Sequence, residues 1–380
     1  MMYLDNAAGT RVYPEVIETI TEVLQNHWGN ASAEYSFGND ARNIINNVTE
    51  QVANDINCKP EEIIWTSGAC EANSLAIMGV LKSNPSRIFY TTNLEHTSIS
   101  EIVNSFGSSS TMFRLKNDTE GNIDIASIEK ILKDHYSEWV KSLISISFAN
   151  SEIGIIQDIK SISKVVHKYN GILHVDATQM YPWQRIDVKE LGIDLMSVSG
   201  QKMHAPKGVG FLYVKDGVRL KPMIYGSQQN GRRAGTYPTH LIAAFGKALE
   251  ITRKNNAYNK VKLLRNRLLD QLSIIPNVKL NGPNPNENRL CNNISLTIEG
   301  VKAETLVTMC SLMELFVAKG SACKSYEPKP SETLLAIGLT PEQALNTIRI
   351  SLDEFNTEEE IDTAADIITK LVARIREEKS

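Results

Sequence analysis

The sequence predicts an α/β fold in which a mostly parallel sheet carries helices on both faces and is joined to a smaller α+β domain. The chain has 380 residues, enough for more than one packed layer. Strand-like and helix-like segments alternate through its middle, the pattern of a parallel sheet covered on both faces. After about residue 255 this pattern ends. We therefore expect a large domain over 15–255 and a small domain formed by 1–14 and 256–380.

Short apolar runs bounded by turn residues predict the strands of the large domain. They lie at 62–66, 87–91, 143–148, 171–175, 194–198 and 208–214. The segments 71–81 and 159–169 have the apolar spacing of helices. Because helices alternate with strands along the chain, the strands should run mostly parallel.

The small domain is predicted from a different pattern. Residues 292–298 alternate between apolar and polar side chains, as a half-exposed strand does, and 349–352 is expected to pair with them. Thr357 and Glu360 form a capping box that should begin an amphipathic helix ending near residue 376. The Pro- and Asn-rich stretch 281–286 is predicted to be a loop.

Composition narrows the class of protein. The chain is 42% hydrophobic and 22% charged with a formal net charge of −4, so no basic field favours nucleic acid as a direct ligand. No run of 18 apolar residues predicts a membrane span, and the charged N-terminus does not resemble a signal peptide. The five cysteines include no C-x-x-C pair, which argues against a disulfide framework or a metal site. We expect a cytoplasmic enzyme.

Two predicted strands end in groups that suit one cofactor. Asp176 follows the apolar run 171–175, and Lys202 follows the run 194–198. The ends of parallel strands meet at one crevice of the sheet. Pyridoxal phosphate needs a lysine for its Schiff base and an acid against its pyridine nitrogen. The alternative is a buried ion pair of Asp176 and Lys202, which the residue types alone would favour.

A strand-to-helix turn at 66–73 could hold the cofactor phosphate. Small residues there, including Ala69 and Cys70, let the backbone approach an anion, and a helix N-terminus presents free N–H groups to it. Ser199 could reach the same phosphate. His96 follows another strand end, where an imidazole could stack on a pyridine ring or move protons, although a surface histidine is the simpler interpretation.

Seven motifs, taken together and in order, resemble one family: 3–8, 66–69, 95–96, 152–154, 174–177, 199–202 and 231–236. They are similar to those of the cysteine desulfurases related to NifS and IscS, which are class V aminotransferase-like enzymes of pyridoxal phosphate fold type I. The resemblance runs from about residue 3 to about residue 362. It implies a seven-stranded type of sheet in the large domain, and a catalytic cysteine loop in the small one.

The resemblance implies roles for the cofactor residues. Lys202 matches the Schiff-base lysine, Asp176 the acid on the pyridine nitrogen, and Gln179 the residue that contacts the phenolic oxygen. His96 matches the histidine that stacks on the ring, and Ser199 matches a phosphate ligand. The cofactor site would be completed by Ala69, Cys70, Ser151 and Gln201.

The resemblance also assigns substrate and subunit contacts. Arg349 matches the arginine that binds the substrate carboxylate, a task that suits a planar guanidinium, and Asn150 matches an asparagine near that carboxylate. Thr236 matches a threonine that reaches the phosphate of the partner subunit, which implies a homodimer.

Cys323 lies in a stretch rich in Gly and Ser, before Pro328 and Pro330, which predicts an exposed loop. Lys319 and Lys324 could favour its thiolate form. An incidental surface thiol is the alternative. The resemblance assigns Cys323 to attack the sulfur of bound L-cysteine, which gives L-alanine and a persulfide that is passed to an acceptor protein. Iron–sulfur, tRNA thiolation and DNA phosphorothioation pathways all remain open for that acceptor.

The sequence departs from the family pattern close to the expected cofactor. Cys70 stands where the family has a threonine, Ser151 where it has a second asparagine, and Gln201 where it has a histidine. The stretch 225–230 lacks the acid and arginine that often precede Gly231. We expect an active desulfurase that holds its cofactor more loosely. The alternatives are a catalytically weak scaffold with the same fold, or another class V reaction such as transamination or selenocysteine lysis.

Overall fold

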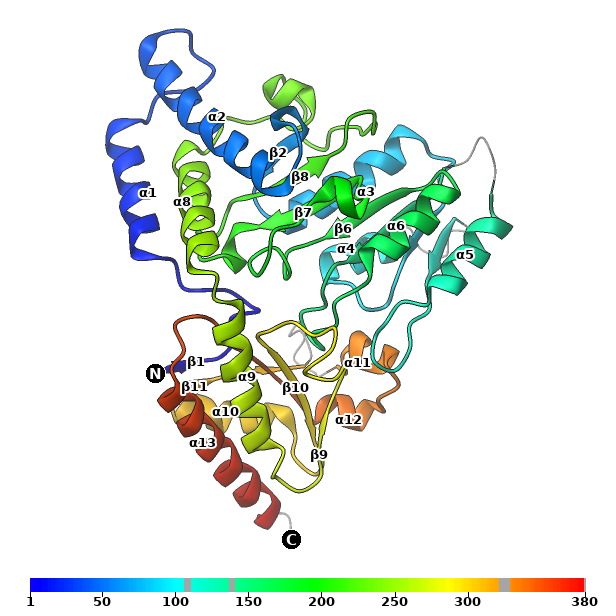
Figure 1. Ribbon diagram of the computed structural model, residues 1–380, viewed down its shortest axis with the longest axis vertical. Coiled ribbons are helices and arrows are strands. Elements are labelled where there is room, and N and C mark those ends of the chain that lie inside the picture. The colour runs from blue at the N-terminus through cyan, green and yellow to red at the C-terminus, as the bar shows by residue number, and fades with distance from the viewer. Residues whose placement is uncertain (106–110, 137–140, 321–328, 379–380) are drawn as a thin grey trace.

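The computed structural model describes residues 1–105, 111–136, 141–320 and 329–378. Two sheets organise it, one in the upper and one in the lower half of Figure 1. The larger has seven strands in the order β2-β8-β7-β6-β5-β3-β4. Their bounds are β2 (Ile63–Thr66), β3 (Phe89–Thr91), β4 (Met112–Arg114), β5 (Leu143–Ser147), β6 (Ile172–Asp176), β7 (Leu195–Ser199) and β8 (Gly210–Val214).

This sheet confirms the predicted fold class. The ladders from β7 through β6, β5 and β3 to β4 are all parallel, and β8 is antiparallel to both of its neighbours. The six predicted strands are present, with ends that differ by up to two residues. Sequence reasoning missed β4, a short strand of half-buried residues whose apolar run is too brief to identify.

Helices cover both faces because neighbouring residues of each strand point in opposite directions. Ile63 packs into one apolar cluster with the helices α2, α5, α6 and α8, whereas Ile64 packs into another with α3 and α4. In Figure 1 the sheet lies between these layers. The helices of this half are α1 (Pro14–Asn26), α2 (Ser36–Ile56), α3 (Ala69–Ser83), α4 (Thr97–Ser105), α5 (Ile125–Asp134), α6 (Ile159–Lys168), α7 (Val188–Leu191) and α8 (Thr239–Asn255).

The smaller sheet is antiparallel, with the order β12-β13-β10-β9. Arg349 of β13 pairs with Ser295 of β10, which confirms the predicted pairing. The prediction of a half-exposed strand was wrong, because β10 is buried at every position and its polar side chains are covered as well. A two-stranded parallel ladder joins β1 to β11 beside it. The strands are β1 (Met2–Tyr3), β9 (Val278–Leu280), β10 (Asn293–Ile298), β11 (Leu315–Phe316), β12 (Ala318–Lys319) and β13 (Thr347–Ser351).

Among the described residues, five helices accompany the smaller sheet: α9 (Tyr258–Leu272), α10 (Ala303–Leu312), α11 (Glu332–Ala336), α12 (Pro341–Leu345) and α13 (Glu358–Glu377). The predicted capping box begins α13, because the Thr357 side chain accepts from the Glu360 N–H while the Glu360 side chain reaches back. Three short 3-10 turns complete the regular structure of the part of the chain that the structure describes: η1 (Pro60–Glu62), η2 (Gly200–Lys202) and η3 (Gln228–Gly231).

We propose a domain boundary between α8 and α9, near residue 255. Its support is the separation of the apolar clusters: side chains of α8 pack with the large sheet, and those of α9 pack with the small one. Leu4 is fully buried in the small cluster although it lies near the N-terminus. This supports placing the first residues of the chain in the small domain, but Tyr13 packs in the large cluster, so the assignment of 1–14 stays a prediction.

Candidate active site

The carboxyl ends of β6 and β7 bring the two key predicted residues to one edge of the sheet. Asp176 is the last residue of β6 and pairs in parallel register with Ser197 of β7, and η2, directly after β7, carries Lys202. Asp176 is 6% exposed. Its Oδ2 accepts from Asn73 Nδ2 at 2.8 Å, and its Oδ1 accepts from the Thr178 N–H at 3.0 Å. These donors hold the carboxylate in one orientation.

Lys202 lies in an environment that favours its neutral amine. Nζ donates to the Ala8 carbonyl at 2.6 Å. Burial lowers the pKa of Lys202 to about 8, and the nearby positive charge of Arg349 contributes a smaller shift in the same direction. At pH 7.5 roughly a quarter of the side chains would then be neutral, against roughly one in a thousand for an ordinary lysine. A neutral amine is the form that attacks an aldehyde or removes a proton.

The turn before α3 has the shape of an anion site. Gly68 adopts φ +144°, which a residue with a side chain rarely does, and Ala69 and Cys70 then open the helix. A Cβ on Gly210 of the neighbouring strand would lie 2.8 Å from the Gly68 Cα, so glycine there permits the close approach. Cys70 is exposed, and Ser199 lies near Gly68 at the end of β7.

An ion pair ties a distant segment to this turn. Arg233 donates from Nε to Glu71 Oε1 at 2.6 Å and from Nη2 to Oε2 at 3.1 Å. Glu71 also accepts from the Ser67 N–H at 2.7 Å. Gln229, in the stretch without the usual acid and arginine, instead makes three bonds to the backbone of Trp65 and Arg233. The stretch is thereby held beside β2 despite its departure from the family pattern.

Arg349 projects from β13 of the small sheet. Its Nη2 donates to Asp5 Oδ1 at 2.7 Å, and the two side chains are 16% and 22% exposed. Asn150 lines the same cavity as Arg349. Its amide oxygen accepts from the N–H groups of Glu152 and Ile153 in its own turn, and its amide nitrogen donates to the carbonyl of Leu94, which follows another strand. The predicted role of Asn150 at the substrate carboxylate stays a prediction.

One large cavity of about 1110 Å³ collects nearly all of the predicted residues. It is lined by Ala69, Cys70, His96, Asn150, Ser151, Asp176, Gln179, Ser199, Gln201, Lys202 and Arg349. Thr236 does not line it and is exposed. Cys323 lies outside the described residues, but Lys319 and Gly320, shortly before it in sequence, line the cavity.

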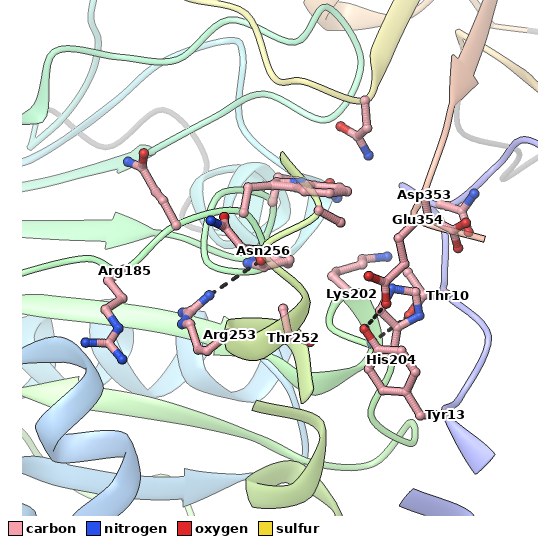
Figure 2. A pocket seen from close by; sticks show the side chains of 17 residues that line it. Thr10, Tyr13, Arg185, Lys202, His204, Thr252, Arg253, Asn256, Asp353 and Glu354 are labelled. Atoms are coloured by element: carbon pink, nitrogen blue, oxygen red, sulfur yellow. Dashed lines mark hydrogen bonds between the residues drawn. The ribbon is translucent and has the colours of Figure 1, made fainter. Parts of the chain in front are cut away.

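A smaller cavity of about 380 Å³ shares Gln179 and Lys202 with the large one (Figure 2). Its labelled residues come from both halves of the molecule, and Tyr13 donates to Glu354 on one side of the cavity. None of the other predicted site residues that the structure describes lines this cavity. We therefore place the chemistry in the large cavity.

Three contributors to the site were missed when the sequence was considered alone. Asn73 is completely buried in α3 and orients Asp176, and a buried asparagine inside a helix is the signal that could have found it. Burial raises the pKa of Glu95 and of Glu152 to about 7. Glu95 and Glu152 belong to the motifs 95–96 and 152–154, but the local sequence does not show whether a side chain will be buried.

The donor set of the large cavity fits pyridoxal phosphate. Asp176 would supply an oriented carboxylate for the ring nitrogen, Lys202 would supply an amine of lowered pKa for the aldehyde, and the start of α3 with Ser199 would supply donors for the phosphate. Thr178 Oγ1 is buried without a hydrogen-bond partner among the described residues.

The described residues hold no cluster of three or more metal-ligating side chains. No helix in the described parts is long and apolar enough to cross a bilayer.

The profile of the aminotransferase class-V family matches residues 2–363. The cysteine desulfurase IscS of Clostridium botulinum is 37% identical over 99% of this chain and 95% of its own length. The chain belongs to the cysteine desulfurase family. Desulfurases of this class V family depend on pyridoxal phosphate, so the cofactor predicted from Lys202 and Asp176 is confirmed.

Solved structures agree with this membership. A NifS-like protein superposes with a TM-score of 0.90 at 28% identity, covering 98% of this chain and 99% of that one. SspA in complex with cysteine gives a TM-score of 0.80 at 29% identity, with coverage of 94% and 100%. DndA from Streptomyces lividans gives 0.75 at 30% identity, with coverage of 92% and 99%. The predicted seven-stranded desulfurase fold is thereby confirmed.

Proposed function

We propose that this desulfurase converts L-cysteine to L-alanine, leaves the sulfur as a persulfide on Cys323, and passes it to an acceptor protein. One observation carries the proposal: Asp176, Lys202 and Arg349 line a single cavity, although Asp176 ends β6, Lys202 lies in the turn after β7, and Arg349 lies in the middle of β13 in the other sheet. The relatives named cysteine desulfurase and the SspA structure with cysteine support L-cysteine as the substrate.

The cofactor, when bound, supplies an electron sink that labilises bonds at the substrate Cα and Cβ. The residues of this chain do the rest. Arg349 binds the substrate carboxylate and so orients the amino acid. The neutral amine of Lys202 accepts a proton from the substrate and later returns it. Asp176, held in one orientation by Asn73 and Thr178, would place its carboxyl group against the cofactor nitrogen.

Sulfur transfer needs a second nucleophile, for which we propose the thiolate of Cys323. It attacks the substrate sulfur, so a sulfur–sulfur bond forms as the carbon–sulfur bond breaks. The electron pair of the broken bond stays with the substrate carbon, and a proton added to that carbon completes L-alanine. No external oxidant or reductant is required, because the persulfide retains the oxidation equivalent.

We further propose a homodimer that works in the cytoplasm. Thr236 is exposed in the single chain, and this supports a role at the partner's phosphate. The four described cysteines are free thiols, which suits a reducing compartment. The acceptor protein, rather than this acidic chain, would contact any nucleic acid. Both the IscS relatives and the DndA neighbour support a sulfur-donating role without choosing its pathway.

The first experiment measures L-alanine released from L-cysteine by cofactor-loaded wild type and Cys323→Ser. Cys58→Ser is the matched control, since Cys58 is a half-buried thiol outside the cavity. We expect alanine from wild type and the control, and none from Cys323→Ser. Alanine from Cys323→Ser at the wild-type rate would overturn the role of Cys323. No alanine from any variant with cofactor bound would favour the scaffold or transaminase alternatives.

A further inference from the structure

The N-terminal motif has a place in the family pattern but no role in the mechanism above. Asp5, in this motif, contacts Arg349, the arginine that we propose binds the substrate. The distance between Asp5 Oδ1 and Arg349 Nη2 is 2.7 Å. Resting on the proposed function, we propose that Asp5 is a positioning residue: it fixes the guanidinium of Arg349 in the orientation that receives the substrate carboxylate. Asp5 itself does not contact the reacting atoms.

The backbone holds Asp5 firmly against the strand that carries Arg349. Asp5 forms a parallel bridge to Ser351, two residues beyond Arg349 on β13. The Asn6 N–H donates to the Ser351 carbonyl at 3.1 Å, and the Ser351 N–H donates to the Leu4 carbonyl at 2.8 Å. Asp5 and Arg349 are therefore fixed to the same ladder, and the carboxylate serves as a rigid reference for the arginine.

The ion pair leaves donors of the guanidinium for a ligand. The hydrogen bond to Asp5 is made through Nη2 of Arg349, and Nε of Arg349 is buried without a hydrogen-bond partner among the described residues. The side chain of an unheld arginine has several rotatable bonds, so its orientation would have to be selected anew at each binding event.

The same segment also contacts the cofactor residues. The Ala8 carbonyl accepts from Lys202 Nζ at 2.6 Å, and the Ala7 carbonyl accepts from Gln179 Nε2 at 3.2 Å. Residues 5–8 thus contact both Arg349, which would bind the substrate carboxylate, and Lys202, whose amine would transfer the substrate protons. This arrangement sets the spacing between the two groups, and small errors in such spacing are expensive in catalysis.

A competing role for Asp5 makes the opposite prediction. If Asp5 occupied the arginine in place of the substrate, removing its charge would strengthen binding of L-cysteine. If Asp5 positions the arginine, truncation weakens binding, and a side chain that keeps the acceptor oxygen restores it. Asp5→Ala and Asp5→Asn therefore separate the two roles by the direction of change.

The test measures KM and kcat for L-cysteine in both variants, and titrates L-alanine and cysteamine against the cofactor absorbance. L-alanine has the carboxylate without the sulfur, whereas cysteamine has the sulfur without the carboxylate. For Asp5→Ala we expect KM and the L-alanine Kd to rise about tenfold with little change in kcat, as for one lost charge-assisted hydrogen bond. Asp5→Asn should stay within about threefold of wild type, and cysteamine binding should not change.

Lower KM values in both variants would overturn positioning in favour of competition. Unchanged L-alanine binding in Asp5→Ala would overturn any role of Asp5 at Arg349. The L-alanine titration needs no desulfuration, so it tests Asp5 even if Cys323 proves not to be the nucleophile. Failure of the proposed function would instead appear as a wild type that binds L-alanine but releases none from L-cysteine.

Discussion

Glu152 should make the stability of this protein fall as the pH rises through neutrality. Its Oε2 accepts from Ser331 Oγ at 2.6 Å, and its Oε1 is buried without a hydrogen-bond partner among the described residues. Burial raises the pKa of Glu152 to about 7, although Ser331 and Arg349 act in the opposite direction. Because the folded state then holds its proton more tightly than the unfolded state, the stabilisation is complete below about pH 4.5 and lost by about pH 8.

The size of the effect follows from these two pKa values. Linkage gives a contribution of about 1.4 kcal/mol at pH 6 and about 0.1 kcal/mol at pH 8, a loss of about 1.3 kcal/mol. Glu152→Gln keeps the shape and removes the titration. We therefore expect the stability of Glu152→Gln relative to wild type to improve by about 1.3 kcal/mol between pH 6 and pH 8.

Urea unfolding of the cofactor-free protein at the two pH values measures this difference. Glu95, whose pKa burial also raises to about 7, is present in both proteins, so its contribution cancels in the comparison. Glu34→Gln is the control, because Glu34 is exposed and its replacement should change stability equally at both pH values. A Glu152→Gln difference that is the same at pH 6 and pH 8 would refute the reasoning.

Three further predictions concern the large cavity. Cofactor-free enzyme should form a borohydride-reducible adduct with pyridoxal phosphate at a rate that rises with pH around a midpoint of about 8, which is the lowered pKa of Lys202. Lys202→Ala should form no such adduct. A midpoint near 10 would contradict the lowered pKa. Cys70→Thr should lower the Kd for pyridoxal phosphate at least about threefold in equilibrium dialysis, since a hydroxyl donates more strongly than a thiol. An unchanged Kd would show that position 70 does not contact the phosphate. Gly320→Ala would put a Cβ 2.9 Å from both Glu152 Oε1 and Leu334 Cδ1, so it should lower stability by about 1–3 kcal/mol in thermal unfolding. Gly9→Ala, with no atom within 4 Å of the new Cβ, is its control, and equal melting temperatures would contradict the predicted clash.

Much of the fold could be predicted from local patterns. Apolar runs located the strands that end at Asp176 and Ser199, and the capping box located the start of α13, because periodicity and caps depend on near neighbours in the chain. The edge strand β4 was missed, since three half-buried residues carry too little apolar signal.

The sequence by itself determined which residues we expect at this site: a lysine and an acid near the ends of predicted strands, an arginine in a strand of the small domain, and a small-residue turn. Only the tertiary structure decided which of them meet and in what protonation state. Asp5 and Arg349 are 344 positions apart, and their ion pair depends on the ladder that joins the N-terminal segment to β13. The lowered pKa of Lys202 and the raised pKa of Glu152 come from burial among elements distant in sequence. Desolvation depends on everything packed around a group, and no local pattern records it.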